Sequence, residues 1–478
     1  MCDAMDADEV EALLKEQDAK GTKDISRNAK GKKGTLQNAK GKKGISRNAK
    51  KNTITSQKRK KGKSEMTGTK YNTFMKRRKV TSEDALGIIS GPLGPTLSEE
   101  ELQARLRMLS ALPAIPAWNW GEPVITVGSD FTGINCIGLS LLLNGIKHQH
   151  LFMCENDPNC LKMLMYHFPG TTTFIGDIRK RDHNLLPTVD LFTTTFPCQS
   201  YSAQGPKGGS DDPRGALFEY SLAYVKAKLP KVVCMENVSN LRSQFNDVLR
   251  KIFREMSAAG YTIPAEEHVI TDTLYNGIPQ SRPRLVAIFI RKDTLKREFV
   301  PPARLDHVVK LSLLIPPSDR AGKLPPIKEF FRERVRQSWR VLTKKGWDPK
   351  TDVIVTDVGC SEKFKNTMVN LMPCITARRG EARAYYISTK GDKMSHKDML
   401  MSHGMPPRFY DRDAAGVADG QFGKQLGNGI SCNVMMRYLP KALFSAGLVN
   451  GYYDYWGDTV RKLRDLNATH AVRSLRNP

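Results

Sequence analysis

The sequence predicts an α/β protein: a mostly parallel sheet with helices on both faces, joined to a smaller second unit and preceded by a disordered basic tail. Three observations support this prediction. Short apolar runs alternate with helical stretches from about residue 122, the alternation stops between about 300 and 420, and the first 80 residues are repetitive and basic. Alternating strands and helices are typical of parallel sheets that are covered on both faces.

The basic tail carries more than half of the chain's net charge of +26. Residues 1–80 contain 23 Lys and Arg against 9 Asp and Glu, and the units DISRNAKGKK, GTLQNAKGKK and GISRNAKKN follow one another at a ten-residue period. Such units have too few apolar residues to offset the entropy of ordering, so we expect disorder. The charge indicates a nucleic-acid partner. KRKKGK (58–63) and KRRKV (76–80) are candidate nuclear import signals or phosphate-binding patches, and a solubilising tail is the alternative.

The composition argues against several other classes of protein. The nine cysteines are scattered, with no CxxC pair and no Cys/His cluster at zinc spacing, so we expect a reducing compartment and no structural metal. The N-terminus, MCDAMDADEVEAL, is acidic where a signal peptide is basic, and no apolar run approaches about 18 residues. The expectation is a soluble intracellular protein, located in the nucleus of a eukaryote or otherwise in the cytoplasm or nucleoid.

The expected elements follow in order along the chain. A capping box of Ser98 and Glu101 begins a helix in SEEELQARLRMLSAL. The expected strands are PVITVGSDF, HLFMCEN, TTTFIGD, VDLFTTTFP, KVVCMENV and RLVAIFI, and the expected helices between them are IGLSLLLNG, PNCLKMLMYHF, LFEYSLAYVKAKL and FNDVLRKIFREMSAAG. Ligands of such a sheet bind at the carboxyl ends of its strands.

Three successive strand ends carry residues suited to a nucleotide-like ligand. The first ends in a turn with Gly133 and Gly138, where backbone N–H groups and close approach suit such a ligand. Glu155 follows the second strand and suits ribose hydroxyls, and Asp177 follows the third and suits an adenine amino group. Phe131 is placed to pack on the ring. Together these residues predict an adenosine-containing cofactor.

The remaining motifs resemble those of a known family. Pro197-Cys198-Gln199 follows the fourth strand. A single cysteine is most often a packed core residue, but here further motifs follow it in a consistent order along the chain. These are Glu236 in Glu-Asn-Val, then Gln280, Arg282 and Arg284 in NGIPQSRPRLVAIF, and QLGNGISCNV near the C-terminus. With the glycine turn and the two acids, this series resembles the DNA (cytosine-5) methyltransferases over residues 124–292 and again over 421–440.

The resemblance implies a class I methyltransferase (Rossmann-like) fold with a smaller target-recognition domain. It divides the chain into a disordered tail and linker (1–97), the first part of a catalytic domain (98–305), a target-recognition domain (306–420), a return to the catalytic domain (421–450) and a C-terminal basic extension (451–478).

The resemblance also implies a reaction and a set of site residues. Carbon 5 of cytosine is a poor nucleophile until a thiolate adds at carbon 6, which is the role implied for Cys198. Glu236 would hold a proton at ring nitrogen 3, Arg284 the carbonyl at position 2, and Arg282 either a phosphate or the cysteine loop. The methyl donor would be S-adenosylmethionine, and the target base of double-stranded DNA would be flipped out by a monomer. The cofactor residues would be Phe131, Gly133, Glu155, Asp177 and Asn428, and the substrate contacts Pro197, Gln199, Ser202, Gln280, Thr376 and Arg378, with Arg379 and Arg383 as further candidates.

Departures from the family and two rival functions remain. Asn135 and Cys136 stand where many members have glycines, and Asn156 stands where a bulky apolar residue is frequent, which bears on cofactor affinity. One rival is a relative that acts on RNA, although the Cys-Phe-Thr signature of the tRNA enzymes is not evident. The other is a catalytically silent chromatin-binding protein, against which the intact Cys198, Glu236 and Arg284 argue.

Overall fold

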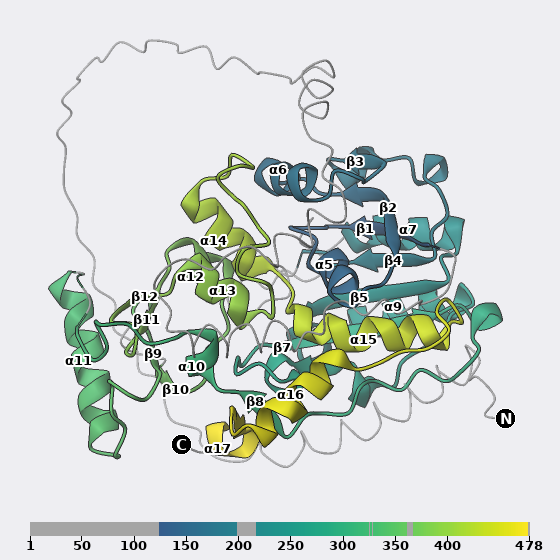
Figure 1. The fold of residues 1–478 in the computed structure, drawn as a ribbon. Helices are drawn as coiled ribbons and strands as arrows, with labels where there is room; N and C mark the ends of the chain where they lie inside the picture. Colours follow the sequence, from purple (N-terminus) through teal and green to yellow (C-terminus); the bar gives the residue numbers. More distant parts are fainter. Residues whose placement is uncertain (1–123, 198–216, 325, 327, 361–366, 477–478) are drawn as a thin grey trace, which may run out of the picture. The chain divides into compact units, whose positions relative to one another are not determined.

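The computed structural model describes residues 124–197, 217–324, 326, 328–360 and 367–476 of the 478-residue chain (Figure 1). All of these residues belong to one compact unit. The basic tail and the helix expected at Ser98 lie outside the described residues, as does the segment that contains Cys198, Gln199 and Ser202.

A seven-stranded sheet forms the centre of the described structure. Its order is β3-β2-β1-β4-β5-β7-β6; β1 to β5 run parallel, whereas β7 is antiparallel to both β5 and β6. The strands are β1 (Ile125–Asp130), β2 (His148–Cys154), β3 (Thr173–Ile175), β4 (Leu191–Thr194), β5 (Val232–Val238), β6 (Ile270–Asp272) and β7 (Pro283–Ile290). The sequence predicted all of them except β6.

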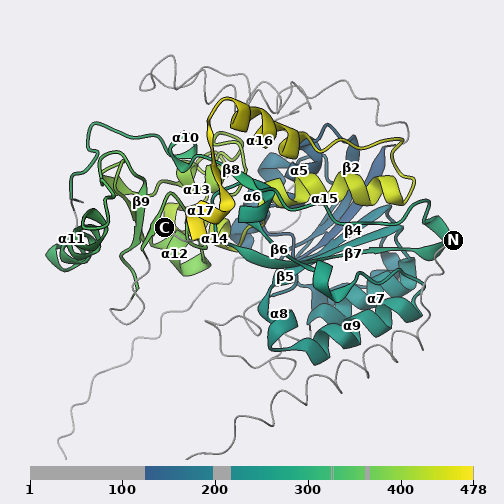
Figure 2. The same cartoon turned by 90° about the horizontal axis from the view of Figure 1, so that it is seen from below.

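Helices cover both faces of this sheet, as expected (Figure 2). One face bears α5 (Cys136–Leu143), α15 (Cys432–Ser445) and α16 (Tyr455–Asp465), and the other bears α7 (Phe218–Lys228), α8 (Asn240–Ser243) and α9 (Asn246–Ala258). α6 (Pro158–His167) connects β2 to β3. Successive residues of β5 enter opposite cores: Val232 and Cys234 pack with the first set, and Val233 and Met235 with the second. Burial on both sides explains why the first four residues of β5, Val-Val-Cys-Met, are all apolar.

A second, antiparallel sheet has the order β10-β9-β11-β12. It consists of β9 (Ile354–Asp357), β10 (Thr367–Val369), β11 (Tyr385–Ile387) and β12 (Asp392–Lys393), accompanied by α10 (Leu311–Leu314), α11 (Glu329–Thr343), α12 (Ala377–Glu381), α13 (His396–Ser402) and α14 (Asp419–Asn428). The sheet falls within the segment predicted as a target-recognition domain. The domain boundaries themselves stay predictions.

The chain then returns to the central sheet. Ser140 Oγ donates to the carbonyl oxygens of Cys136 and Cys432, which joins α5 to α15. Beyond α16, β13 (Thr469–Ala471) pairs antiparallel with β8 (His307–Val309) and leads into α17 (Val472–Arg476). The sequence predicted only a basic extension here and missed these elements. Among the described residues, we find no helix that combines the length and the apolar character needed to span a membrane.

Candidate active site

The carboxyl ends of β1 and β2 meet around Glu155. One carboxylate oxygen accepts a hydrogen bond from the backbone N–H of Gly133 at 2.8 Å, and the other accepts from the backbone N–H of Asp157 at 2.8 Å. Gly133 has φ of 60°, and a Cβ there would meet no atom within 4 Å, so the turn borders open space. Burial raises the pKa of Glu155, although these N–H groups oppose the shift. Two of the predicted cofactor residues therefore lie in direct contact.

Asn135 explains how this turn forms without a glycine at that position. It adopts φ of 61°, a left-handed conformation that asparagine tolerates better than most residues. Its side chain caps α5 by accepting from the backbone N–H of Gly138 at 2.9 Å, and its amide nitrogen lies 3.2 Å from His150 Nε2. The departure from the family pattern is thus accommodated by local hydrogen bonding.

The other predicted cofactor residues occupy nearby positions on different elements. Phe131 follows β1 with φ of 56°, and its carbonyl oxygen accepts from Thr195 Oγ1 at 2.7 Å. Asp177 follows β3 and forms an ion pair with Arg179 at 2.6 Å, and hydrogen bonding from Arg179 lowers the pKa of Asp177 to about 2. Asn428 is exposed at the end of α14. All three side chains keep their ligand roles as predictions.

A buried ion pair supports the end of β1. The guanidinium of Arg181 binds both carboxylate oxygens of Asp130, and Ser221 Oγ donates to the same carboxylate at 2.7 Å. Ser221 lies in α7 and also contacts Thr194 Oγ1 at 3.0 Å, at the end of β4. The network therefore ties the beginning of α7 to the ends of β1 and β4. It joins residues that are far apart in the sequence, and no local pattern indicated it.

Glu236 and Arg284 meet on neighbouring strands. Glu236 is 8% exposed on β5, and its Oε1 lies 3.3 Å from Arg284 Nε on β7. The antiparallel register pairs Val238 with Arg284, which brings the two side chains together across the sheet. Burial raises the pKa of Glu236, and the nearby guanidiniums of Arg284 and Arg282 only partly oppose this shift. The structure thus joins two residues that were predicted from separate motifs.

The strand that leads to Cys198, β4, lies beside β5, the strand that carries Glu236. Asn237, the residue after Glu236, donates from its side-chain nitrogen to the carbonyl oxygen of Phe196 at 3.1 Å. Pro197 follows at the edge of the described residues, partly buried. Asn237 was not predicted as a site residue, although it stands within the Glu-Asn-Val motif. It connects the strand of the candidate acid to the start of the cysteine loop.

Arg282 is buried and binds backbone carbonyl groups of two other segments. It is 2% exposed; Nη1 donates to the carbonyl of Ile375 at 2.6 Å, and Nη2 donates to those of Gly427 and Gly429 at 3.1 and 2.6 Å. The backbone N–H of Arg282 donates to Asp272 Oδ1 at 2.7 Å. In this structure the guanidinium is enclosed by these carbonyl groups and does not face solvent. Arg282 is therefore a positioning residue, and the phosphate contact is corrected.

Cys374 is a neighbour of both arginines that the sequence analysis missed. Arg282 Nη1 donates to its sulfur at 3.3 Å and Arg284 Nη2 at 3.7 Å. Burial alone raises a thiol pKa, but the positive charges of the two guanidiniums outweigh it, so the pKa of Cys374 is lowered. The cysteine comes from a distant segment, and nothing in the local sequence marks it.

The predicted substrate contacts are divided between exposed and buried positions. Gln280 is 0% exposed and bridges to the backbone of Met372, so its side chain lies inside the protein rather than at a surface that DNA reaches. Thr376 is half-buried before α12, and a Cβ on Gly427 would lie 2.4 Å from its carbonyl oxygen, so it lies against the end of α14. Arg378 is exposed, and no described residue forms an ion pair with it.

Two further candidates from the same segment are engaged by acids. Arg379 Nε donates to Asp357 Oδ2 at 2.7 Å, and Arg383 Nε lies 3.6 Å from Asp419 Oδ2. Arg379 is 20% exposed and holds α12 to β9. Of this arginine group, Arg378 is the best placed to contact a ligand.

The strand order and the residues at its carboxyl edge define a class I methyltransferase: five parallel strands, an antiparallel β7, and an acid after each of β2 and β3. A family model described as C-5 cytosine-specific DNA methylase matches residues 126–315. The comparisons therefore support a C-5 cytosine-specific DNA methylase domain over these residues.

Curated relatives match parts of the chain. The type II methyltransferase M.HhaI of Haemophilus parahaemolyticus is 28% identical over 269 residues, covering 54% of this chain and 77% of that protein. The type II methyltransferase M.HaeII of Haemophilus aegyptius is 34% identical over 173 residues, covering 36% and 52%. The orphan methyltransferase M.SPRI of Bacillus phage SPR is 32% identical over 176 residues, covering 36% and 39%. The chain thus spans from 39% to 77% of these three proteins.

Solved structures with a related fold include the methyltransferase EhMeth of Entamoeba histolytica and the Dnmt2 methyltransferase of S. pombe. The first has a TM-score of 0.46 at 18% identity and covers 68% of this chain and 99% of that chain. The second has a TM-score of 0.46 at 16% identity and covers 67% and 98%.

Proposed function

We propose that this protein transfers a methyl group from S-adenosylmethionine to carbon 5 of cytosine in double-stranded DNA. The observation that carries the proposal is the pairing of buried Glu236 with Arg284 beside the strand end that leads to Cys198. The description of the matching family model, C-5 cytosine-specific DNA methylase, supports the choice of DNA. Along one edge of its ring, cytosine offers Glu236 ring nitrogen 3 and the exocyclic amine, and it offers Arg284 the carbonyl oxygen at position 2.

The proposed reaction begins with Cys198. Its thiolate adds to carbon 6, and the electron pair of the 5,6 double bond moves to carbon 5 as the ring becomes enamine-like, which makes carbon 5 nucleophilic. After methyl transfer, a base removes the proton from carbon 5 and the bond from sulfur to carbon 6 breaks. One difficult step thereby becomes two easier steps, and the electron pair of the broken bond stays on sulfur, which returns Cys198 to the thiolate form.

Glu236 and Arg284 bind the same edge of the base in this proposal. Protonated Glu236 donates to ring nitrogen 3 and offers its other oxygen to the exocyclic amine, and the raised pKa of Glu236 favours the protonated form that this role needs. Arg284 donates to the carbonyl oxygen at position 2, where negative charge grows as sulfur adds. Arg282 and Asn237 hold the neighbouring segments in place through their hydrogen bonds to backbone carbonyl groups.

The residues at the ends of β1 and β2 fit the proposed cofactor. The open space beside Gly133 admits a ligand close to the backbone, and the Glu155 carboxylate suits ribose hydroxyls. Asp177 suits an adenine amino group, and exposed Asn428 lies on the C-terminal side. S-adenosylmethionine supplies an electrophilic methyl group when bound. The protein residues bind it and orient it toward the base.

Glu155→Ala is expected to weaken binding of S-adenosylmethionine by about 1–3 kcal/mol, because ribose hydroxyls would lose a buried acceptor. The substitution also removes the two hydrogen bonds that the Glu155 carboxylate accepts from the backbone N–H groups of Gly133 and Asp157. Isothermal titration calorimetry measures the effect, with Glu219→Ala on the surface of α7 as the control. Equal affinity for the Glu155 variant and the wild type would mean that this strand end does not bind the cofactor.

The target carbon lies within a stacked duplex, so the proposed reaction includes flipping of the base at a cost of a few kcal/mol. We propose that the protein acts as a monomer on double-stranded DNA and that the basic tail adds sequence-independent affinity. The segments KRKKGK and KRRKV also support nuclear import if the source is a eukaryote.

Removal of residues 1–80 is expected to flatten the dependence of DNA affinity on salt. Each phosphate contact contributes about 0.9 to the slope of log affinity against log salt, because bound Lys and Arg release counterions. Fluorescence anisotropy across a salt series measures the slope for the full chain and the truncated chain. The same slope for both proteins would show that the tail does not contact DNA.

The proposal is tested by incubating the purified protein with radiolabelled S-adenosylmethionine and either duplex DNA or tRNA. Incorporation into DNA at carbon 5 of cytosine supports it. Incorporation into tRNA alone would favour the RNA-modifying alternative, and the absence of transfer to both, with cofactor binding retained, would favour the silent scaffold. Bisulfite sequencing of DNA from expressing cells then identifies the modified sites.

A further inference from the structure

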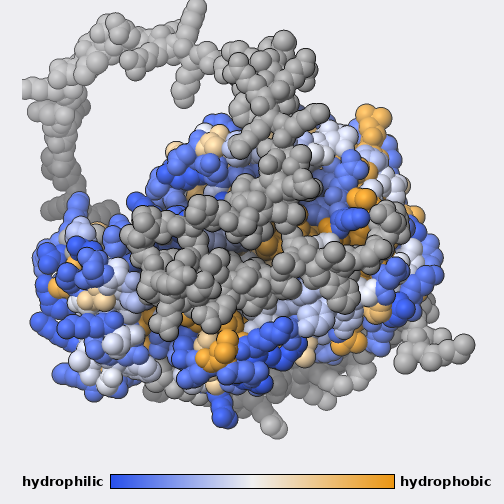
Figure 3. All heavy atoms as spheres, viewed as in Figure 1, coloured by the Kyte–Doolittle hydropathy of each residue, from blue (hydrophilic) through white to orange (hydrophobic). Residues whose placement is uncertain are grey.

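α11 lies at the far side of the second sheet from the central sheet in both cartoon views (Figures 1 and 2). Its inner side is apolar: Val335 and Trp339 pack in a small core with Ile354 of β9 and Tyr386 of β11. Its other sides carry four arginines, and Lys344 follows as the C-cap residue. Figure 3 shows that hydrophilic residues cover most of this end of the surface. The basic side of α11 is not part of the candidate active site.

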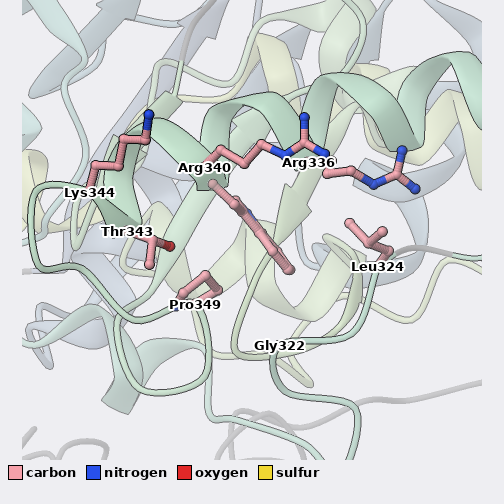
Figure 4. A pocket seen from close by; sticks show the side chains of 8 residues that line it. Gly322, Leu324, Arg336, Arg340, Thr343, Lys344 and Pro349 are labelled. Atoms are coloured by element: carbon pink, nitrogen blue, oxygen red, sulfur yellow. The ribbon is translucent and has the colours of Figure 1, made fainter.

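A hollow of about 580 Å³ lies beside the C-terminal half of α11. Figure 4 shows Arg336, Arg340 and Lys344 following one another along the helix, with loop residues across from them. These cations are spaced by four residues, which is about 6 Å of rise along a helix, so they form one row. No acid lines the hollow, which is bordered by Gly322, Leu324, Arg336, Trp339, Arg340, Thr343, Lys344 and Pro349.

The charges in this row differ in their partners. Arg336 forms ion pairs with Glu329 and Glu333 on the same helix. Arg340 and Lys344 are exposed, and among the described residues neither forms an ion pair or a side-chain hydrogen bond. Two exposed cations without such partners, beside a hollow that no acid lines, indicate an anionic ligand.

We infer that this hollow binds backbone phosphates of a nucleic-acid segment that extends beyond the bases at the active site. The partner class rests on the proposed function. A row of cations suits successive phosphates, whereas the open hollow is larger than a single phosphate needs. Leu324 and Pro349 offer apolar surface to sugars. The proposed contacts go to phosphates, which carry no sequence information, so we expect the contact to be independent of sequence.

The test compares Arg340→Glu/Lys344→Glu with Arg254→Glu/Arg473→Glu in the full chain. The control makes the same change in net charge at exposed positions outside the hollow. Fluorescence anisotropy is measured with unrelated duplexes of about 40 and about 12 base pairs over a salt series. On the longer duplex, the α11 variant should lose about tenfold in affinity and about 2 from the salt slope relative to the control, because two phosphate contacts are lost.

Further readouts separate the possible outcomes. Affinity for the shorter duplex and methyl transfer into it should match the control, and Arg340→Gln/Lys344→Gln should show a smaller loss in the same direction. Equal affinities and slopes for the α11 variant and the control on the longer duplex would overturn the inference. A second result would also overturn it. If poly-glutamate released the longer duplex from the wild type but not from the variant, the hollow would select an acidic peptide rather than a nucleic acid. The binding comparison remains informative if the wild type transfers no methyl group, which would contradict the proposed function alone.

Discussion

Cys198→Ala is expected to lower kcat for DNA methylation by at least about 10⁴-fold, because carbon 5 is not activated without addition at carbon 6. Binding of S-adenosylmethionine should stay within a factor of about two of wild type, since the assigned cofactor residues lie on other strands. The measurement is transfer of labelled methyl groups under single-turnover conditions.

The matched control for this variant is Cys160→Ala. Cys160 is 7% exposed in the core on α6, so the change removes a thiol of similar type without touching the proposed reaction. The control should keep kcat near wild type. Substantial turnover by Cys198→Ala would show that another group performs the addition and would remove Cys198 from the mechanism.

Glu236→Gln is expected to lower kcat by about 10²–10⁴-fold, since an amide can donate to ring nitrogen 3 but cannot transfer a proton to it. Stability should not fall in parallel. The pKa of Glu236 is raised by burial, so its ionised form opposes folding, and the wild type loses stability as pH rises through the range between the unfolded and folded pKa values of this residue. The glutamine variant lacks this loss and should melt at or above the wild-type temperature above that range.

Two comparisons separate catalysis by Glu236 from a structural role. Glu255→Gln, on α9, breaks an ion pair at the surface with Lys226 of α7 and should leave kcat unchanged. In the wild type, kcat should decline as pH rises through the pKa of Glu236, and this decline should be absent from the residual activity of Glu236→Gln. If activity and melting temperature fell together, the residue would be serving the fold rather than the reaction.

Elements with a strong local pattern could be predicted from the sequence. β1, β4 and β5 are buried along nearly their whole length, and β2 is buried mainly in its second half. Each contains a short apolar stretch that could be recognised, and the polar residues that follow mark the edge where ligands bind. β6 was missed because it has only three residues and an ordinary composition. Residues 451–478 were predicted to be a basic extension because of their charge. That prediction overlooked the apolar side by which α16 packs.

The missed site residues depend on contacts between distant segments. Cys374 meets Arg284 across 90 residues of sequence, and Arg282 reaches Gly429 across 147. No periodicity or spacing reports such contacts. The expected phosphate role of Arg282 was reasonable for an arginine near a nucleic-acid site, but its guanidinium is enclosed by carbonyl groups. Asn135 likewise departs from a glycine pattern, and only its left-handed conformation and capping bond explain how it fits.

The covalent role of Cys198 is tested most directly with DNA that carries fluorine at carbon 5 of the target cytosine. Release of the enzyme requires removal of a proton from carbon 5, and fluorine leaves no proton there to remove. Wild-type protein with S-adenosylmethionine should therefore form a complex with this DNA that survives denaturing electrophoresis, and Cys198→Ala should form none, even if it still binds and flips the base. No trapped complex with an active wild-type enzyme, or a trapped complex with Cys198→Ala, would contradict the mechanism.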